Sequence, residues 1–450
     1  MKTIVIIGGG FSGTLTAIQL LKKSKDVKVI LINSSLPLAK GIAYSTNLPE
    51  HLLNVPAGKM SPFSDQPEHF VNWLNEQNYA GENLTESFLP RLIYGKYLVE
   101  ILKSFKSLEQ LEQIEEKAVD IQKVSDSYIV RLKSGESVVA NQIVLALGNF
   151  LPANPPIKRI TFFESKNYFQ NPWAPEYLNN IDLKKDILLI GTGLTMVDCV
   201  LSLKKAGFAG KILVASPRGY TPAPHGKTDV YPDFYLELKG LSLAEMFHLI
   251  RKHLKIAESK NISWRGVVDS LRPHVQEIWV NFSKKEKQQF ISHVRHIWGI
   301  ARHRLPMTTY KELFDLKASG KLEIIGGRII DMQDNEGNVS AIVQLRKSTE
   351  QKTLIVSRVI NCTGPQTNYK DLKDELVINL LAKEMIVADE LKMGIQTTLK
   401  GNVLQQNNQP SSDIYAIGSL LRGVLWETTA VPEIRVQAES IAQQIIESIN

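Results

Sequence analysis

Apolar residues are grouped along this chain in short runs that alternate with segments of helical spacing. The run at 2–7 breaks into three glycines, helical spacing follows over 11–24, and VKVILIN at 27–33 is again a strand-like run. A strand, a glycine turn, a helix and a second strand make one βαβ unit. The same order returns mid-chain, where DILLIGTGL precedes helical spacing and then KILVASP. The pattern therefore predicts two copies of one α/β unit.

Alternating strand-like segments follow each unit. The first set, DIQKV, SYIVRLK and ESVVANQIVLALGN, ends at Gly148, and the second set, RIIDMQ, VSAIVQLRK and TLIVSRVINCTG, ends at Gly364. Each set predicts a small antiparallel meander that closes on an apolar strand ending in glycine. The repeat is one of architecture rather than of sequence.

These patterns predict an α/β fold with two dinucleotide-binding, Rossmann-like domains, each with a small antiparallel β-meander. We expect an FAD-binding domain made of 1–155 and 366–450, which is discontinuous in sequence. An NAD(P)H-binding domain is expected over 156–365, with a helical insertion at about 220–305 that makes the second copy longer.

Helix-start signals support the insertion and a last helix. Ser242 with Glu245 and Ser283 with Glu286 are S-x-x-E capping boxes, each before an apolar-periodic stretch. A final helix is expected to begin near Pro432, because proline suits a first helical turn, where its missing amide hydrogen is not needed.

The first glycine turn has the spacing of a dinucleotide-binding fingerprint. Gly8 permits the tight turn, Gly10 lets a pyrophosphate approach the backbone, and Gly13 lets the helix pack closely on the strand. The acidic residue expected about 20 positions further on, to hold the ribose hydroxyls, is Asn33 in this chain. Asparagine can still accept a hydrogen bond there, without charge assistance.

The second glycine turn is less complete. Gly191 and Gly193 keep the first two roles, while Met196 stands where the third glycine belongs. Ser216 ends the second strand of this unit, and Arg218 follows it with no carboxylate nearby, so the arginine could accommodate a ribose 2′-phosphate. We therefore expect permanently bound FAD at the first turn and exchanging NADPH at the second. A solvated surface arginine on a degenerate copy of the fold is the alternative.

The C-terminal stretch carries another strand that ends in glycine. DIYAIGS ends at Gly418 and Ser419, and LLRGVLWETTAVPEIR leads into the last helix. In paired dinucleotide folds such a helix start lies under the flavin ring, where its partial positive charge stabilises the reduced flavin. Thr428, Thr429 and Ala430 are the candidates for this contact, and a plain capping role for the threonines is equally open.

Five blocks in order, GIAYST, HLLNVPAGKMS, GTGLTMVD, WGIARHRLP and LWETTAVPEIRVQA, resemble a bacterial FAD/NAD(P)-binding family. That family includes FAD-dependent urate hydroxylase and an aspartate N-monooxygenase. The resemblance covers essentially the whole chain and implies a flavin monooxygenase, in which NADPH reduces FAD and the reduced flavin uses O2 to hydroxylate a small substrate. It also implies that Leu53, Asn54 and Val55 lie near the flavin. Ser419 departs from the aspartate common in wider flavoprotein families.

The two glycine turns, the C-terminal stretch and the family resemblance predict two sets of cofactor-binding residues. For FAD they are Gly8, Gly10, Phe11, Ser12, Gly13, Asn33, Ser34, Leu53, Asn54, Val55, Ala146, Leu147, Gly148, Gly418, Ser419 and Thr429. For NADPH they are Gly191, Gly193, Leu194, Thr195, Ser216, Arg218 and Gly364.

The catalytic residues stay unassigned, because the cofactor carries most of such chemistry. The candidates are Thr428, Thr429, Glu427, whose carboxylate could manage protons, and His225, which follows the last strand of the second unit. An ordinary loop histidine is the alternative at His225.

Histidines near the end of the insertion invite a metal interpretation, which the neighbouring arginines oppose. They could instead attract an acidic substrate or a cofactor phosphate, or form a solvated basic helix face; the cluster is His293, His296 and His303 with Arg295, Arg302 and Arg304. No metal site is expected.

The two cysteines, Cys199 and Cys362, are far apart in sequence and form no CxxC pair. They predict buried, inert thiols and no dithiol redox mechanism.

Composition narrows the class of partner. The net charge is +7, but lysines and arginines are spread along all 450 residues, which argues against nucleic acid. No stretch approaches the roughly 18 apolar residues of a membrane span. We expect a cytoplasmic oxidoreductase with a small-molecule substrate and O2, of open oligomeric state. The alternatives are a flavin reductase or dehydrogenase that passes electrons to another acceptor, and a non-catalytic FAD-binding protein.

Overall fold

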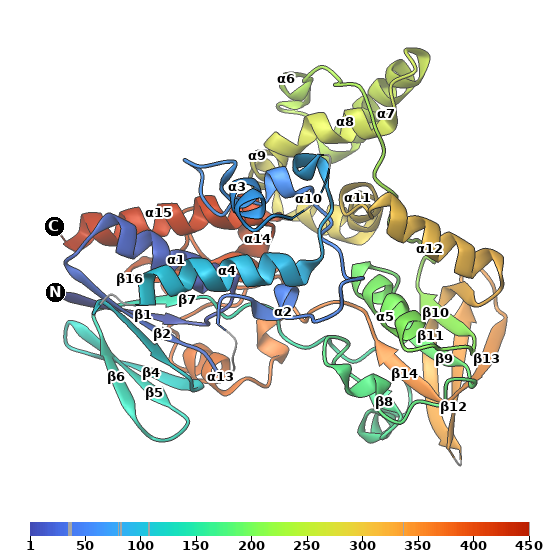
Figure 1. Cartoon of the computed structure of the whole chain (residues 1–450), viewed down its shortest axis with the longest axis horizontal. Helices are drawn as coiled ribbons and strands as arrows, with labels where there is room; N and C mark the ends of the chain where they lie inside the picture. The colour runs from blue at the N-terminus through green and yellow to red at the C-terminus, as the bar shows by residue number, and fades with distance from the viewer. Residues whose placement is uncertain (35–37, 80, 82, 107–108, 336, 450) are drawn as a thin grey trace.

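The computed structural model describes residues 1–450 except 35–37, 80, 82, 107–108, 336 and 450, and it is built around two large sheets (Figure 1). Strand order in the first sheet is β15-β16-β7-β1-β2-β3. Its strands are β1 (Lys2–Ile7), β2 (Val27–Ile32), β3 (Leu111–Ile114), β7 (Gln142–Leu145), β15 (Asn402–Leu404) and β16 (Pro410–Ala416). The first sheet therefore draws strands from both ends of the chain.

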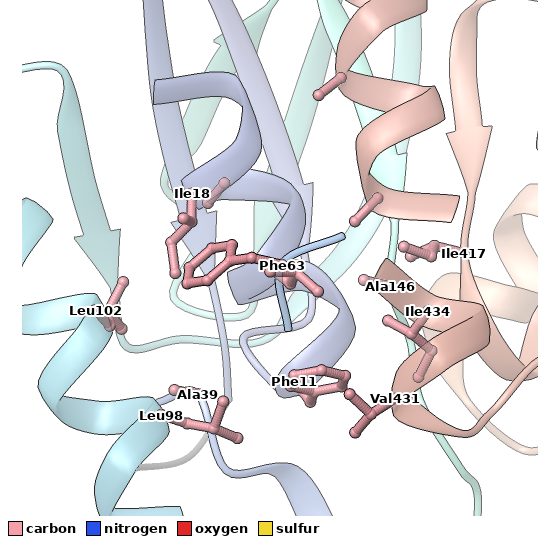
Figure 2. Packing of buried hydrophobic residues seen from close by; sticks show 14 of the residues in the cluster. Phe11, Ile18, Ala39, Phe63, Leu98, Leu102, Ala146, Ile417, Val431 and Ile434 are labelled. Carbon is pink, nitrogen blue, oxygen red and sulfur yellow. The ribbon is translucent and has the colours of Figure 1, made fainter. Parts of the chain in front are cut away.

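Both faces of the first sheet are covered, because its apolar strands alternate between two cores. Ile4 and Ile6 belong to one core and Val5 and Ile7 to the other. The first core lies under α1 (Phe11–Lys23), α4 (Arg91–Lys106) and α15 (Val431–Ile449). The starts of α1 and α15 lie close together at Phe11 and Val431 (Figure 2). The second core lies under α13 (Glu375–Ala382) and a separate three-stranded sheet.

That small sheet is the first meander predicted from the sequence. It consists of the antiparallel strands β4 (Ala118–Val124), β5 (Ser127–Leu132) and β6 (Ser137–Ala140). The next strand, β7, leaves the meander and pairs in parallel with β1. The glycine that ends the predicted apolar run therefore sits at the carboxyl edge of the large sheet.

The second sheet has the order β13-β12-β11-β10-β9-β14-β8. Its strands are β8 (Tyr168–Phe169), β9 (Ile187–Ile190), β10 (Ile212–Ser216), β11 (Leu322–Asn335), β12 (Asn338–Leu345), β13 (Gln351–Val356) and β14 (Arg358–Asn361). The long β11 pairs in parallel with β10 up to Gly326 and antiparallel with β12 from Gly327 onward. The second meander is thus a continuation of the large sheet, unlike the first.

Helices α5 (Leu194–Lys205) and α12 (Met307–Ala318) cover one face of the second sheet. Between β10 and α12 the chain forms the helical insertion, whose first helices project at the top of Figure 1. Its helices are α6 (Tyr235–Leu238), α7 (Leu243–Ser259), α8 (Trp264–Leu271), α9 (Val275–Asn281), α10 (Lys284–Gln289) and α11 (Arg295–Arg302), with a π-helix, η6 (Phe290–Val294), before the last. The insertion has a hydrophobic core of its own.

Short elements complete the chain. They are α2 (Gly41–Tyr44), α3 (His69–Glu76), α14 (Arg422–Leu425) and the 3-10 helices η1 (Ala57–Lys59), η2 (Leu84–Glu86), η3 (Ile160–Glu164), η4 (Pro175–Leu178), η5 (Arg272–His274), η7 (Tyr369–Asp371) and η8 (Gly418–Leu421). No helix in the described ranges is long and apolar enough to cross a membrane.

The predicted fold class is confirmed, with two α/β units, two antiparallel meanders and a helical insertion in the second unit. Both predicted capping boxes form, at Ser242 and Ser283. Pro432 lies in the first turn of α15, as proline at a helix start should. We refer below to the first and second domains by their sheets; the residue boundaries between them stay a prediction.

Candidate functional site

Two glycines in the first turn occupy positions that admit no side chain. Gly8 has a φ of +112°, and a Cβ there would lie 2.1 Å from the carbonyl oxygen of Ala146. A Cβ on Gly13 would lie 1.9 Å from the carbonyl oxygen of Gly8, so α1 packs on the turn itself. Both roles predicted for these glycines, the tight turn and the close helix approach, agree with this geometry.

The start of α1 presents uncapped amides. Gly10 precedes the helix in an extended conformation, and no side chain of the described residues caps it. Elsewhere in the chain Ser242, Ser283 and Asp374 each accept a hydrogen bond from the first turn of their helix. The first-turn amides of α1 therefore keep hydrogen atoms that an anionic group could accept.

Asn33 lies at the end of β2, beside the glycine turn. Its Oδ1 accepts a hydrogen bond of 2.8 Å from the amide of Gly9. The side chain thus helps to fix the turn, and the contact with a ribose predicted for Asn33 stays a prediction. Ser34, the next residue, is exposed.

Two further segments reach the same edge of the first sheet. Gly148 after β7 and Gly418 after β16 both have positive φ, at 69° and 75°. The hydroxyl of Ser419 donates to the carbonyl of Gly148, and a Cβ on Gly418 would lie 3.1 Å from Ser12 Oγ. Residues distant in sequence, including the buried Ala146 and half-buried Leu147, therefore gather around the start of α1.

The loop that the family resemblance places near the flavin lies where the two domains meet. Leu53 is buried, and its amide donates to the carbonyl of Leu89 over 2.8 Å. The carbonyl of Asn54 lies 3.0 Å from Nε2 of His225, which belongs to the second domain. Val55 packs against the core of the first domain. The loop is therefore tied to both domains.

His225, one of the catalytic candidates, is thus placed at the domain boundary. Its ring packs on Phe88 with centroids 4.7 Å apart. Burial lowers its pKa, and the nearby Arg304 lowers it further, although the hydrogen bond to Asn54 opposes this shift. The imidazole is therefore neutral at physiological pH, in the form that has one N–H donor and one acceptor nitrogen.

A strained turn precedes the start of α15. Trp426 has φ 65° and ψ −73°, and the amide of Glu427 donates to the carbonyl of Leu425 over 2.9 Å. Such a three-residue turn is rare for a residue with a large side chain. It leads into Thr428, which is buried, and Thr429, which is exposed. No described residue offers Thr428 Oγ1 a hydrogen-bond partner.

The helical insertion holds this turn in place. The Trp426 ring packs against Trp279 and Phe290, each with centroids 5.0 Å apart, and Trp279 Nε1 donates to the carbonyl of Gly423 over 2.9 Å. Gln276 Nε2 donates to the carbonyl of Glu427 over 2.6 Å. The sequence analysis did not identify Trp279, Phe290 and Gln276. The only signal for them in the sequence is the number of aromatic residues in the insertion.

The Glu427 carboxylate is fully engaged by the insertion. Its two oxygens accept from Trp298 Nε1 over 2.9 Å and from Arg302 Nε over 3.0 Å. The Arg302 side chain is only 6% exposed and also lies 3.8 Å from Glu433. These contacts favour an anchoring role for Glu427 over the proton transfer considered from the sequence.

The second glycine turn repeats the first with one change. Gly191 has a φ of +104°, and a Cβ there would lie 2.6 Å from the carbonyl oxygen of Cys362. Gly193 is extended, and no described side chain caps α5. Met196, in place of the third glycine, is fully buried in the core between α5 and the sheet. Its side chain fills the space that a closer helix approach would remove.

The remaining residues predicted to bind NADPH lie at the same edge of the second sheet. Ser216 Oγ is 3.0 Å from Thr192 Oγ1 and accepts from the amide of Gly219 over 3.1 Å. Leu194 and Thr195 form the half-buried first turn of α5, and Gly364 after β14 has a φ of +92°.

A positive patch forms beside Ser216. Arg218 Nη2 donates to the carbonyl of Ser292 over 3.0 Å, which brings it to the π-helix of the insertion. Burial and the charges of Arg295 and Arg218 lower the pKa of His296 to about 4. Arg218, Arg295 and His296 therefore lie together, and the patch suits a phosphate at the end of β10.

The predicted cluster of basic residues is divided by the fold. Arg302 pairs with Glu427, as described above, and Arg304 Nη1 lies 2.9 Å from Asp269. His293 and His303 are exposed. Over the described ranges, no group of three or more His, Cys, Asp or Glu side chains is arranged to hold a metal ion.

The expectation that Cys199 and Cys362 are not neighbouring thiols is wrong. They are not neighbours in sequence, but Cys199 Sγ and Cys362 Sγ lie 3.6 Å apart, since α5 packs on the end of β14. Both are buried, as expected, and burial raises the pKa of Cys362 well above its ordinary value. The thiolate needed for exchange chemistry is therefore disfavoured.

A cavity of about 580 Å³ lies between α9 of the insertion and α15. Arg272, Gln276, Glu427 and Glu433 contribute polar groups to its wall, and Val436 is among its apolar residues. Periodicity in the sequence could not locate this space, because the wall comes from segments more than 100 residues apart.

Comparison with known proteins agrees with this geometry. Residues 5–150 match the model of a family described as FAD-NAD(P)-binding. That range contains the first glycine turn, the loop 53–55 that the family resemblance places near the flavin, and Gly148. No curated protein sequence matches the chain.

Solved structures share the fold over the whole chain. The L-lysine 6-monooxygenase of Pseudomonas syringae has a TM-score of 0.70 and 13% identity, with both chains covered completely. The ornithine N-hydroxylase of Kutzneria sp. 744, solved with reduced FAD, NADP+ and L-ornithine, has a TM-score of 0.67 and 13% identity, again over both complete chains. Thioredoxin reductase of Lactococcus lactis has a TM-score of 0.56 and 12% identity, over 99% of this chain and 98% of its own. At this identity the likeness shows a common fold.

Proposed function

We propose that this protein is an FAD-dependent oxidoreductase that is reduced by NADPH and hydroxylates a small polar substrate with O2. The observation that carries the proposal is the pair of uncapped glycine turns, at α1 and α5, in domains that meet at the Asn54 loop. Helix starts of this kind bind pyrophosphates, and two of them allow two nucleotides to be held at once.

The residues of the first domain fit FAD. Gly8 and Gly13 leave no room for side chains beneath the turn, and the amides at the start of α1 are available to a pyrophosphate. The start of α15, after the Trp426 turn, supplies the partial positive charge that a reduced flavin would need. FAD would supply the electron transfer and the reaction with oxygen, while the protein orients the substrate and excludes water.

The residues of the second domain fit NADPH better than NADH. Arg218 and Arg295 offer positive charge beside Ser216 at the end of β10, where an acidic residue would repel a 2′-phosphate. The fully buried Met196 leaves the turn itself unchanged, because Gly191 and Gly193 retain their conformations.

Hydroxylation is supported by the neighbours in fold. The ornithine and lysine enzymes named above are similar to this chain over its complete length, at TM-scores of 0.67 and 0.70. They suggest a primary amine as the substrate class, and the family resemblance adds aspartate and urate as further candidates.

A reductase that passes electrons to another acceptor is the second candidate, because thioredoxin reductase also shares the fold. The neighbouring thiols of Cys199 and Cys362 invite this interpretation. However, they are buried, and the raised pKa of Cys362 disfavours dithiol exchange.

The test is oxidation of NADPH under ¹⁸O2 in the presence of L-ornithine, L-lysine, cadaverine, L-aspartate or urate, with mass spectrometry of the product. A product that contains one oxygen atom from ¹⁸O2 supports the proposal. Reduction of bound flavin by NADPH, with no labelled product from any of these compounds, would favour the reductase. Absence of reduction by either NADPH or NADH would contradict both functions and leave a non-catalytic FAD-binding protein.

A further inference from the structure

Helix α5 of the second domain contacts the first domain along one face. Asp198, Ser202 and Lys205 are spaced by four and three residues, which places them on the same side of the helix. Each has a partner in the first domain; the pairs are Asp198 with Arg91, Ser202 with His51, and Lys205 with Glu50.

The contact between Arg91 and Asp198 has two points. Arg91 Nη1 lies 2.7 Å from Asp198 Oδ2, and Nη2 lies 3.3 Å from Oδ1. Both side chains are partly shielded, at 19% and 18% exposed. A two-point contact of this kind fixes the angle between its partners as well as their distance. The pair of Glu50 and Lys205 contributes less, because the Lys205 side chain is 59% exposed and solvent screens its charge.

The same contacts reach the loop expected beside the flavin. Arg91 Nε also donates to the carbonyl of Leu52 over 3.0 Å. His51 Nε2 lies 3.1 Å from the carbonyl of Asp198 and 3.0 Å from Ser202 Oγ. With the contact between Asn54 and His225, the second domain is thus connected to this loop directly at His51 and Asn54. It is connected at Leu52 through Arg91, which pairs with Asp198.

We propose that Arg91 and Asp198 are positioning residues that set the distance between the flavin and nicotinamide rings, by docking α5 on the loop from His51 to Val55. The inference rests on the proposed function. Neither residue needs to touch a ring, because α5 begins at the NADPH turn and the loop lies at the FAD site. Hydride transfer depends steeply on geometry, so a small rotation of one domain would slow it strongly.

The experiment uses the complete FAD-loaded protein and follows flavin reduction by NADPH in an anaerobic stopped-flow instrument. The variants are Asp198→Ala, Arg91→Met and the double variant. The matched control is Lys204→Met, since Lys204 lies on the same helix but pairs over 2.9 Å with Glu312 inside the second domain.

For Asp198→Ala we expect the limiting reduction rate at saturating NADPH to fall about tenfold. The NADPH concentration for half-maximal rate and the FAD content should change by less than about twofold, because both turns are intact. The double variant should be no slower than the slower single variant, since both remove the same contact. An unchanged limiting rate in Asp198→Ala, or an equal fall in Lys204→Met, would overturn the inference.

A second measurement does not depend on turnover. Spin labels on Val139→Cys and Phe314→Cys, at exposed positions of the two domains, report the interdomain distance, and both native cysteines are buried. We expect one narrow distance distribution that broadens in Asp198→Ala and not in Lys204→Met. Equal widths of the distance distribution in all three proteins would contradict the positioning role of Arg91 and Asp198. If NADPH does not reduce the flavin of the wild type, the proposed function is contradicted instead. The distance distributions then still test whether Arg91 and Asp198 fix the two domains relative to each other.

Discussion

The first and second glycine turns share two glycines and differ at the third. At the first turn, Gly13 leaves space for the carbonyl oxygen of Gly8, which would lie 1.9 Å from a Cβ. At the second turn, Met196 fills the corresponding place and is fully buried. Gly8 and Gly191 have similar φ angles, of 112° and 104°. The residue at the third position can therefore change while the conformation of the turn is retained.

The surroundings explain how each helix is held. Helix α1 lies between the first sheet and α15, and ten of its thirteen residues are buried, so it is fixed from within its own domain. Helix α5 packs on its sheet through Met196 and turns another face, through Asp198, toward the first domain. Under the proposed function, the close helix approach is found at the turn for permanently bound FAD, and the docking face is found on the helix at the turn for exchanging NADPH.

Gly13 and Met196 occupy the third glycine position of the two turns. Exchanging their residue types should have its largest effect at the first turn. We expect Gly13→Met to destabilise the protein by more than about 4 kcal/mol, because the clash is with backbone that cannot move aside. Urea unfolding measures this change, and the ratio of absorbance at the flavin band to that of the protein measures bound FAD. Gly13→Ala serves as the milder variant and should also lose FAD. Full flavin content in Gly13→Ala would contradict the account.

The reciprocal change at the second turn should have a different result. Met196→Gly removes a buried side chain and places glycine inside a helix, which together destabilise the protein by about 3 kcal/mol. Thermal unfolding should show this loss, while isothermal titration should show NADPH affinity within about threefold of wild type. Tighter NADPH binding with unchanged stability would mean that Met196 is a defect of the nucleotide site rather than part of the core.

Arg218 sharpens the comparison of ligands. Arg218→Gln should weaken NADPH binding by about 10- to 30-fold, because a charge-assisted contact with the 2′-phosphate is lost. Binding of NADH, which lacks this phosphate, should be unchanged, and titration with each nucleotide measures both values. Equal affinity for NADH and NADPH in the wild type would contradict the assignment of Arg218.

His296 gives the smallest effect, through pH. Its pKa is about 4 in the folded protein and near 6.5 when unfolded, so the unfolded chain binds more protons between these values. Its contribution to stability is present above pH 6.5 and is lost as the pH falls toward 4. Between pH 7 and 5, wild type should lose about 1–2 kcal/mol more than His296→Gln, measured by urea unfolding. Parallel pH profiles would place His296 outside the Arg218 patch.

Repeating local patterns made the fold predictable. The two turns, the meanders and the capping boxes at Ser242 and Ser283 depend on residues within a few positions of each other, and all formed. The place of Pro432 in the last helix followed from its backbone chemistry alone.

The contacts that define the site were less accessible, because they join segments far apart in sequence. The pairing of Trp426 with Trp279 and that of Arg91 with Asp198 depend on how whole domains pack. The 3.6 Å approach of Cys199 and Cys362 contradicts an expectation based on their separation in sequence. Glu427 could be identified as charged and near the last helix, but its anchoring by Arg302 required the fold.

The central claim is that FAD and NADPH bind with their flavin and nicotinamide rings in contact. Its most direct test is the anaerobic reaction of the FAD-loaded protein with NADPH that is deuterated at the position from which hydride is transferred. We expect NADPH to bleach the flavin and deuterium to slow the bleaching, because hydride would pass directly between the rings. Binding of both nucleotides without any bleaching would contradict this claim.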